Sequence, residues 1–495
     1  MADLITFLPP PGLSSDDTTF EDEGKWADGS NVRFRQGKPE CIGGWSLLFS
    51  GLGASITDMI GYVNDGTDYV AYGGGAKLFV GAGIDSETGV PTDVTPAGFS
   101  PDGDVFNWSL AAFGSTLLAV PRLGGLYAMP VPGTAAAIVA AAPVKITCML
   151  VTQERQVLAF GCNEEVSGTF NPACIRGSDL EDYNVWTTLP TNNCFEHVLD
   201  DGGTILAAAL VGAYVGVWTT SGLWMGQFVG DPSQAYRFDR VDTGVGAVAT
   251  GAVAVDKGIA YWVGIDLNFY RWEPGAASEM LACPISKDFK ANVDVPTPGV
   301  TSSIRVEVNS SFNEIWILYP DKRDATGVNC SRYLAYCVDE SAAAAAAGGM
   351  AVWYRGQLAR GSMLPPGPLS QVLGAQTLMG DTAGNIYIHE IATAAPDSWF
   401  LQSADQYLDN GKTRMMIRGF VPDFEYQTGD VALTLTMRDR PRATAVAKGP
   451  YTIGETDTKL DFRASGQIAA VRLDGTSMTM RLGKPLFDLV PLGGR

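Results

Sequence analysis

The feature that most constrains the fold is a short unit that recurs along most of the chain: a strand, a tight turn and a second strand that ends in an aromatic residue. Between about residues 56 and 389, runs rich in β-branched and aromatic residues alternate with turns of Gly, Asp and Asn. The aromatic ends of the units are Leu78-Phe79, Leu126-Tyr127, Leu223-Trp224, residues 268–270 (NFY) and residues 385–387 (NIY). The chain holds six or seven such units, spaced by roughly 40 to 60 residues.

Radial repetition explains how so long a chain can bury its apolar residues. A single hydrophobic core stops growing near ~300 residues, whereas propeller blades pack only on their neighbours. The clearest strand runs are residues 69–72, 77–80, 116–120, 156–160, 258–263, 314–319 and 384–389. With 58 Gly, 28 Pro and 46% hydrophobic residues, the chain has the turns and the core for this architecture and is not disordered. The sequence therefore predicts an all-β protein with a β-propeller of six or seven blades.

Two segments differ from the repeating unit. Residues 1–24 contain PPPG at 9–12 and SSDD at 14–17, which predicts an extended N-terminal arm. Residues 401–495 contain long alternating runs, such as 431–437 and 469–473, which predict an additional C-terminal antiparallel β domain. The propeller is then expected over residues 25–400. Within it, the alanines at 342–347 followed by two glycines are interpreted as a low-complexity loop insertion.

Charge and cysteine usage narrow the classes of function. Lys and Arg number 34 and Asp and Glu 54, so the net charge of −20 argues against a protein that grips phosphates, although not against one that DNA merely passes. The first eleven residues lack the basic start of a secretory signal. The uncharged residues 202–230 are interrupted by TTSG at 219–222, which favours two buried strands joined by a turn over a membrane span. Eight cysteines without a C-x-x-C pair indicate reduced, mostly buried thiols.

The search for catalytic or ligand-binding motifs gives no candidate that is preferred over a structural role. Only His197 and His389 exist, which leaves too few histidines for a His-based triad or metal site, and His389 ends a strand. Residues 411–413 (GKT) resemble the end of a phosphate loop, but Gln406 stands where its first glycine would be. Residues 244–249 fit the loose G-x-G-x-x-A pattern, yet a strand pattern follows, which favours a plain turn.

The remaining candidates are acidic clusters, glycosylation sequons and tryptophans. Acidic clusters at 21–23, 164–165 and 200–201 could supply a glycosidase carboxylate pair, but their turn-rich surroundings favour solvated loop charge. The sequons at Asn107, Asn309 and Asn329 have no meaning without a secretory route. Five tryptophans are expected in the blade core rather than in a sugar platform: Trp186, Trp218, Trp224, Trp262 and Trp272. No catalytic, cofactor-binding or metal-binding residue is predicted, and the chain is not expected to be an enzyme.

Several motifs resemble a known family. Residues 28–38 (DGSNVRFRQGK) and 42–45 (IGGW) resemble the N-terminal signature of the tail nozzle proteins of short-tailed bacteriophages, also called packaged-DNA stabilization proteins. The likeness continues at 151–162 (VTQERQVLAFGC), 176–178 (RGS), Trp186, 218–225 (WTTSGLWM), 229–232 (VGDP), 261–262 (YW), 421–424 (VPDF), 449–450 (GP), 461–463 (DFR), 480–483 (MRLG) and 494–495 (GR). Met480 stands where the family pattern has tryptophan.

The resemblance implies a structural virion protein made in the cytoplasm of the host bacterium. Proteins of this family form a ring of six below the portal and its adaptor ring, and they carry or adjoin tail fibres or spikes and a tail tip plug. They extend the DNA channel, retain the packaged genome and let duplex DNA leave through the lumen without specific binding; no membrane insertion is expected. Neither the lumen-facing nor the interface residues can be assigned from the sequence. The alternatives are a phage receptor-binding or glycan-cleaving propeller protein and an intracellular propeller scaffold.

Overall fold

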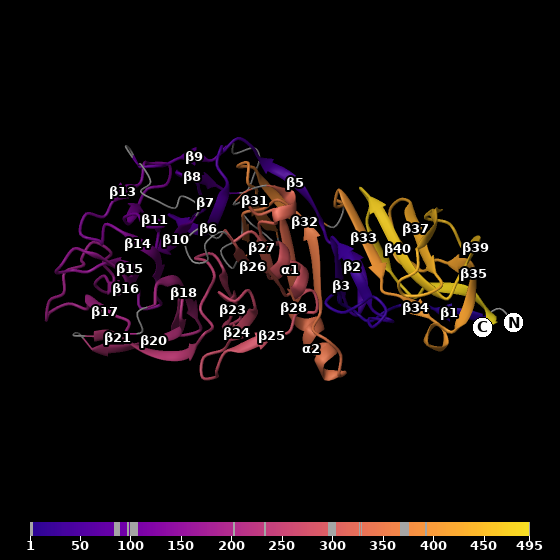
Figure 1. Cartoon of the computed structure of the whole chain (residues 1–495). Coiled ribbons are helices and arrows are strands. Elements are labelled where there is room, and N and C mark those ends of the chain that lie inside the picture. The colour runs from indigo at the N-terminus through magenta and orange to yellow at the C-terminus, as the bar shows by residue number, and fades with distance from the viewer. Residues whose placement is uncertain are drawn as a thin grey trace.

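A computed structural model describes residues 3–83, 90–96, 99, 107–200, 203–231, 234–295, 303–325, 327, 329–366, 376–391 and 394–494. Within these residues the chain is built almost entirely of antiparallel strands, arranged as two bodies side by side (Figure 1). The larger body lies on the left of the view, and the smaller one, which holds both chain ends, lies on the right.

The larger body contains seven four-stranded sheets in the described part of the chain. The first four sheets, here blades 1 to 4, are β6 (Ile56–Asn64), β7 (Thr67–Gly74), β8 (Lys77–Ala82) and β9 (Thr92–Asp93); β10 (Trp108–Phe113), β11 (Thr116–Pro121), β12 (Tyr127–Met129) and β13 (Ala137–Ile138); β14 (Ile146–Val151), β15 (Val157–Asn163), β16 (Phe170–Gly177) and β17 (Phe195–Val198); β18 (Ile205–Val211), β19 (Tyr214–Thr219), β20 (Gly222–Asp231) and β21 (Gln234–Thr243). Blades 5 to 7 are β22 (Val253–Asp256), β23 (Ile259–Val263), β24 (Phe269–Trp272) and β25 (Glu279–Leu281); β26 (Arg305–Asn309), β27 (Glu314–Tyr319), β28 (Arg332–Cys337) and β29 (Trp353–Gln357); β30 (Ser362–Leu364), β31 (Thr377–Gly380), β32 (Ile386–Ile391) and β5 (Gly44–Phe49).

The first strand of each blade lines a common axis. Each of these inner strands contacts the inner strand of the next blade, and β30 contacts β6, so the ring is closed. The last blade is completed by β5, which comes from the other end of the chain and pairs with β32 through Ile386↔Phe49 and Ile388↔Ser46. The larger body is therefore a β-propeller, as predicted, and its described strands make seven blades. The expected strand runs at 69–72, 77–80, 116–120, 156–160, 258–263, 314–319 and 384–389 all coincide with blade strands.

The smaller body is an antiparallel β domain of three sheets. Its strands, sheet by sheet, are β1 (Asp3–Thr6), β42 (Leu486–Gly494), β35 (Thr413–Val421) and β39 (Leu460–Gly466); β2 (Trp26–Ser30), β33 (Ser398–Ser403), β40 (Ile468–Thr476), β37 (Val431–Arg438), β38 (Val446–Ile453) and the short β34 (Gln406–Tyr407); β3 (Val32–Arg35), β4 (Lys38–Cys41), β41 (Met480–Leu482) and β36 (Phe424–Gln427). The alternating burial of β37 gives this domain the apolar face that the sequence predicted, and the first four residues of β40 are all buried.

The domain boundaries differ from those expected. The segment expected as an extended N-terminal arm, residues 1–24, is part of the β domain in its described residues, because β1 pairs with β42 and Leu13 is buried beside Trp26. Residues 26–41 are not the first strands of the propeller, because β2 pairs with β33 and β3–β4 extend the sheet of β41 and β36. The propeller is thus inserted into the β domain. Long-range strand pairing, which local patterns do not encode, decides this arrangement.

Two local expectations also need correction. The alanines at 342–347 belong to helix α2 (Val338–Ala346), not to a loop, because alanine has the highest helix propensity and Asp339 and Glu340 lie favourably in the first turn. The stretch expected as two strands, 202–230, contains three in its described residues, β18 to β20, because Gly212 at φ 63° adds a second tight turn. No helix in the described ranges is long and apolar enough to cross a membrane. A second α-helix of the described residues, α1 (Ser286–Asn292), connects blades 5 and 6.

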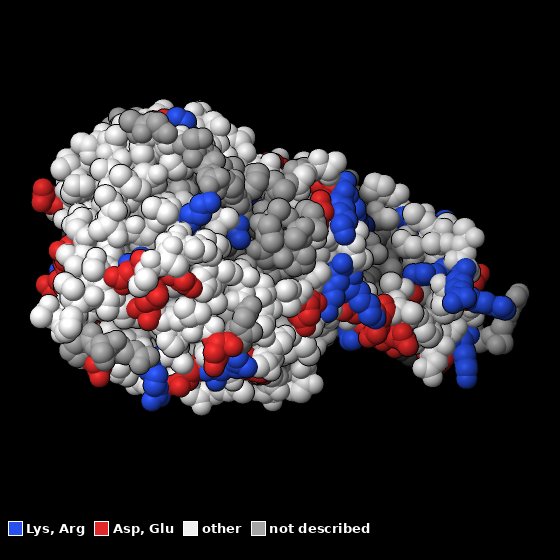
Figure 2. All heavy atoms as spheres, turned by 60° about the vertical axis from the view of Figure 1, so that its left-hand side comes forward, with Lys and Arg blue, Asp and Glu red and all other residues white. Residues whose placement is uncertain are grey.

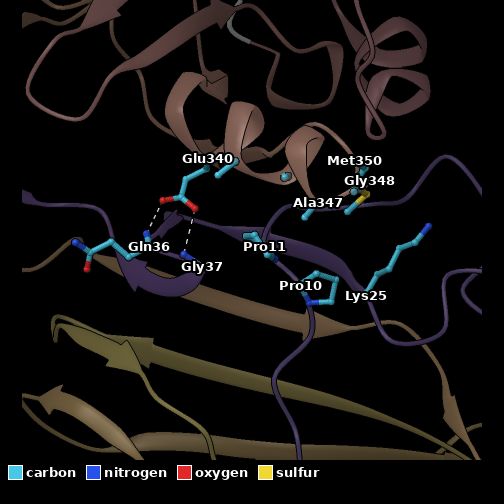
Figure 3. Close-up of a pocket in the computed structure, with 12 residues that line it drawn as sticks. Pro10, Pro11, Lys25, Gln36, Gly37, Glu340, Ala347, Gly348 and Met350 are labelled. Carbon is cyan, nitrogen blue, oxygen red and sulfur yellow. Dashed lines mark hydrogen bonds between the residues drawn. The ribbon is translucent and has the colours of Figure 1, made fainter.

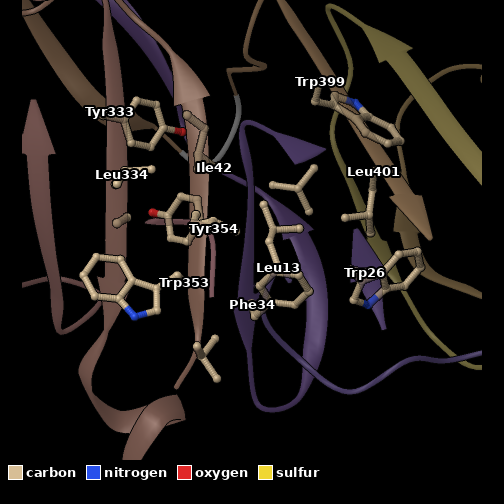
Figure 4. Packing of buried hydrophobic residues seen from close by; sticks show 14 of the residues in the cluster. Leu13, Trp26, Phe34, Ile42, Tyr333, Leu334, Trp353, Tyr354, Trp399 and Leu401 are labelled. Carbon is tan, nitrogen blue, oxygen red and sulfur yellow. The ribbon is translucent and has the colours of Figure 1, made fainter. Parts of the chain in front are cut away.

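The hydrophobic core crosses the boundary between the two bodies. Figure 4 shows Tyr333, Leu334, Trp353 and Tyr354 of blade 6 on one side, and Trp26, Trp399 and Leu401 of the β domain on the other. Leu13, Phe34 and Ile42 fill the space between them, and these three side chains are at most 2% exposed. Because one continuous core joins the bodies, their relative position is fixed by packing as well as by polar contacts.

Candidate functional site: the domain junction and the propeller axis

Arg33 on strand β3 lies at the centre of a buried polar network between the β domain and blades 6 and 7. Its Nε and Nη2 donate to the two carboxylate oxygens of Glu314 on β27, each at 3.0 Å. Its Nη1 and Nη2 donate to Glu390 on β32 at 2.7 and 2.6 Å. Asn309 donates to both carboxylates, and Trp316 and Tyr354 donate to Glu314.

The charged groups of this network are buried, so each depends on its partners for compensation of its charge. Arg33 is 1% exposed and Glu314 is 2% exposed. Burial alone lowers the pKa of Arg33, but Glu314 and Glu390 outweigh it and hold that pKa well above its ordinary value. A buried charge that is paired in this way is tolerated, whereas loss of one partner leaves an uncompensated charge in the core. A glycine at position 43 is also required here, because a Cβ would lie 2.5 Å from the Cα of Glu390.

Other polar residues of the β2–β3 segment also contact the propeller. Asp28 accepts from Nη2 and Nε of Arg355 on β29 at 2.7 and 3.2 Å. Asn31 accepts from the hydroxyl of Tyr333 on β28 at 3.1 Å, and its Nδ2 donates to the carbonyl of Ser398 at 2.9 Å. Together with Arg33, these side chains attach the segment to three strands of blade 6 and to blade 7.

Helix α2 holds the tip of the β3–β4 hairpin. Gln36 and Gly37 form its two-residue turn with φ of 52° and 73°, and both backbone N–H groups donate to the carboxylate of Glu340 (Figure 3). Between α2 and the segment with Pro10 and Pro11 lies a largely apolar groove of about 690 Å³.

Trp45 and His389 form a further contact close to the junction. Their rings stack with centroids 5.3 Å apart, and Arg360 donates from Nε to Nε2 of His389 at 3.0 Å. Burial and the charge of Arg360 lower the pKa of His389 well below its ordinary value, and burial lowers the pKa of Arg360 to about 10. His389 is therefore a neutral acceptor in the core, which confirms the structural role expected for it.

The propeller axis contains a polar cavity of about 250 Å³. It is lined by residues from the inner strands of six blades, including Asp58 on β6 and Arg305 and Glu307 on β26. Arg305 donates from Nη2 to Asn107 at 2.8 Å, and Asp58 accepts from the backbone N–H of Leu110 at 3.0 Å. The cavity has room for several water molecules or for one small polar molecule.

The two carboxyl groups of this cavity titrate near neutral pH. Burial raises the pKa of Asp58 to about 7, although Arg305 opposes the rise. Burial raises the pKa of Glu307 to about 8, with Arg305 opposing and Asp58 adding to it. The charge of the three side chains consequently changes from +1 to −1 as the pH rises through this range, so the cavity can hold or release protons without any large movement.

The other motifs and acidic clusters considered in the sequence lie in strands, turns and connections of the fold. Residues 411–413 lie at the start of β35, and residues 244–249 form the connection between β21 and β22. Asp22 is buried and accepts from Ser14 and Lys25, while Glu164 accepts from Ser167 and Asn171. Asp201 lies outside the described residues, as do Pro232 and Arg495. His197 stacks on Phe238, and no group of three His, Cys, Asp or Glu able to hold a metal occurs in the described part of the chain.

Tryptophans and cysteines agree with the predictions made for them. All five candidate tryptophans are core residues, each at most 5% exposed: Trp186, Trp218, Trp224, Trp262 and Trp272. All eight cysteines are described, none is paired, and seven are buried. The sequon residues Asn107 and Asn309 are also buried, and Asn309 belongs to the Arg33 network.

Sequence reasoning did not identify the residues that form the junction and the cavity. Arg33 and Asp28 belong to the motif at 28–38, but the partners of Arg33 are 281 and 357 residues away along the chain. The sequence does contain a signal for Arg305 and Glu307. In the strand RVEVN these two residues of opposite charge alternate with valines, so both charges lie on the same face of the strand.

Comparison with known proteins gives similarities of fold only. No family model and no curated protein matches the sequence. Among solved structures, similar chains are BBS1N in complex with ARL6DN (TM-score 0.42, 10% identity, 72% of this chain and 99% of that chain) and YCF48 bound to D1 peptide (TM-score 0.41, 11% identity, 70% and 96%). YCF48 from Cyanidioschyzon merolae gives a TM-score of 0.40 at 10% identity, covering 70% of this chain and 98% of that one.

Proposed function

We propose that the chain is a structural protein of the tail of a short-tailed bacteriophage: one subunit of the nozzle ring below the portal and adaptor. In this role it extends the DNA channel, retains the packaged genome and lets the genome leave. The proposal starts from the resemblance of residues 28–38 and 42–45 to the signature of such proteins. It includes a ring of six, no enzymatic activity, and contacts with the adaptor ring, with tail fibres or spikes and with a tip plug.

The observation that carries the proposal is the place of this signature in the fold. Asp28, Asn31 and Arg33 each bond a residue of blade 6. The tip of the same hairpin is held by Glu340, and Trp45 stacks on His389 of blade 7. The motif that resembles nozzle proteins is thus the segment that fixes the propeller relative to the β domain. A rigid joint between two bodies suits a part that must bear the pressure of packaged DNA.

The dimensions of the propeller axis determine where the DNA would pass. The cavity on the axis has a volume of only about 250 Å³. A DNA duplex, whose major groove alone is ~12 Å wide, is too large to pass through it. The DNA channel is therefore enclosed by several copies, which is the arrangement that a ring provides. The excess of Asp and Glu leaves few cations to hold phosphates, in keeping with passage without specific binding.

Two measurements on virions test the proposal. Mass spectrometry of purified virions is expected to find this chain as a structural component, and a reconstruction of the tail is expected to show six copies of the propeller and β domain around the channel. Absence from virions, or five-fold or twelve-fold density for this chain, would refute the proposal. A depolymerase assay on host polysaccharide addresses the glycan-cleaving alternative, for which the buried tryptophans offer no sugar platform.

A further inference from the structure

Acidic and basic residues are unevenly distributed between the two bodies. The propeller, residues 44–393, contains 34 Asp or Glu and 17 Lys or Arg, whereas the β domain, residues 1–43 and 394–495, contains 20 and 17. On the face shown in Figure 2, basic side chains gather over the β-domain end, while acidic ones predominate over the propeller. Because charges are screened within ~8 Å at physiological salt, the local surfaces at each end matter more than the net charge.

The far end of the β domain contains a groove of about 920 Å³, here called the basic groove, lined by Lys412, Arg414 and Arg440. Arg414 pairs with Asp439 at 2.7 Å. Lys412, Arg440 and the neighbouring Arg442 are exposed and form no ion pair with any carboxylate in the part of the chain that is described. Leu492, which is 46% exposed, adds an apolar surface to the same groove.

The outer part of blade 3 carries the opposite charge. Residues 163–200, here called the blade 3 acidic surface, contain seven Asp or Glu and a single basic residue, Arg176. Arg176 is buried and donates from Nη2 to the carbonyl of Trp186 at 2.9 Å, and it lies 3.9 Å from a carboxylate oxygen of Glu165. Asp200 pairs with Arg240 of blade 4 at 3.6 Å, and the other five acidic residues form no ion pair in the described part of the chain. Two apolar side chains project from this surface: Val166 is 97% exposed and Leu189 is 50% exposed.

The carboxylates of this surface lie close together. Burial raises the pKa of Cys194 to about 12, and Asp179, Glu165 and Asp182 all add to the rise. The backbone N–H of Glu165 also donates to the carboxylate of Glu196 on the edge strand β17. Neighbouring carboxylates therefore share this surface with exposed apolar side chains, a combination that is typical of protein interfaces.

The two surfaces lie at opposite ends of the elongated molecule. In Figure 1, β15 to β17 form the left end, and β35 and β39 lie at the right end beside the chain termini. They are therefore too far apart to meet within one copy. Contact between copies through two different surfaces is heterologous, so it either closes into a ring or extends as a filament.

We propose that the basic groove of one copy binds the blade 3 acidic surface of a second copy, head to tail. The occupant is a protein surface rather than duplex DNA, because the groove contains the exposed apolar side chain of Leu492, which a phosphate backbone does not use. The blade 3 acidic surface offers it the exposed side chains of Val166 and Leu189. The contact deepens the proposed function, since it names a surface that could join the subunits of the ring. The contact itself does not depend on the proposed function. Only the expectation that six copies make up the ring rests on it.

Two variants of the full chain test the contact. In the groove variant, Arg440→Glu and Arg442→Glu reverse two exposed cations. In the blade variant, Val166→Lys and Glu181→Lys place cations on exposed positions of the acidic surface. Sedimentation velocity at low and physiological salt is expected to show association of the wild-type chain that weakens with salt. In each variant the dissociation constant is expected to rise by about tenfold or more.

Mixing the variants provides the decisive measurement. The blade variant keeps an intact groove and the groove variant keeps an intact blade 3, so an equimolar mixture is expected to form 1:1 dimers that neither forms alone. Lys448→Glu with Lys459→Glu, exposed residues outside the groove, is the matched control and should associate like the wild type. A wild-type chain that stays monomeric, or a mixture that sediments as separate monomers, overturns the proposal. The proposal is also overturned if the wild-type chain binds a DNA duplex, the groove variant does not bind it, and the groove variant still associates with itself as the wild type does. Because the assay uses purified protein, its outcome is independent of whether the chain occurs in virions.

Discussion

Glu314 of blade 6 accepts two hydrogen bonds from Arg33 of strand β3, although 281 residues separate the two along the chain. Both side chains are buried, and Glu390 of blade 7 completes the group. One guanidinium thus connects the β domain to two blades of the propeller. The stability of the joint between the bodies should depend on this side chain more than on any exposed ion pair nearby.

Substitution of Arg33 by methionine tests this. The Arg33→Met variant leaves the carboxylates of Glu314 and Glu390 buried without their cation, which is expected to cost about 3–5 kcal/mol of unfolding free energy. Urea unfolding followed by tryptophan fluorescence measures the loss. Arg35→Met is the matched control, because Arg35 lies on the same hairpin with its side chain 53% exposed and should change stability by less than about 1 kcal/mol. Equal losses in the two variants would contradict the role assigned to Arg33.

Closure of the propeller by β5 leads to a second prediction. Deleting residues 1–50 removes β1 to β5 and leaves the edge of β32 without its partner. Unpaired edges promote aggregation, so this variant is expected to be less soluble and to melt several degrees lower than the full chain. Deleting residues 1–7 removes only β1 and should have a much smaller effect. The prediction fails if the long deletion melts at the same temperature as the full chain.

Local features of the fold were predictable from the sequence, because turn chemistry and strand periodicity act over a few residues. Residues 77–80 and 116–120 are strands for this reason, and Trp218 and Trp262 are core residues. Partners distant in sequence were not predictable. The pairing of β5 with β32, and of β2 with β33, depends on which edges remain free once the other strands have paired, and no local pattern records that.

The candidate sites show the same division. The motif at 28–38 is recognisable in the sequence, yet nothing near Arg33 indicates that its partners are Glu314 and Glu390. Asp58 and Glu307 share a cavity only because the ring of blades brings β6 and β26 to one axis. Once the propeller fold is known, a charged residue at an inward-facing position of an inner strand predicts a polar site on the axis.

The thiols give a third prediction. Burial raises the pKa of Cys41, Cys148, Cys194 and Cys330 to about 12, so almost none of these groups is a thiolate at pH 8. The thiolate is the reactive form, and burial also excludes the reagent. Iodoacetamide is expected to leave these four unmodified in the native chain over a period in which all eight cysteines react in urea. Mass spectrometry of the modified peptides measures this, and rapid native modification of any of the four would contradict their burial.

The axial carboxyl groups give a prediction about pH. A carboxyl group whose pKa is raised by folding keeps its proton in the native state at a pH where the unfolded chain has lost it. Unfolding therefore releases a proton, and stability falls as the pH rises from the unfolded pKa, ~4.3 for Glu, to the folded pKa. For Glu307 the folded pKa is about 8, so its contribution falls between about pH 4 and pH 8 and is constant above.

The variant Glu307→Gln isolates this effect, because a glutamine has the same shape and cannot ionise. Other groups also respond to pH: Asp58 in the same cavity has a pKa of about 7, and His389 resists protonation in the core. The informative quantity is therefore the unfolding free energy of the wild type minus that of the variant, measured by urea denaturation from pH 5 to pH 9. This difference is expected to fall as the pH rises, by a few kcal/mol at most, and to level off above about pH 8. Glu273→Gln, at an exposed position, is the control and should give a constant difference. A difference for Glu307→Gln that is equally independent of pH would show that this carboxyl group ionises as freely in the folded chain as in the unfolded one.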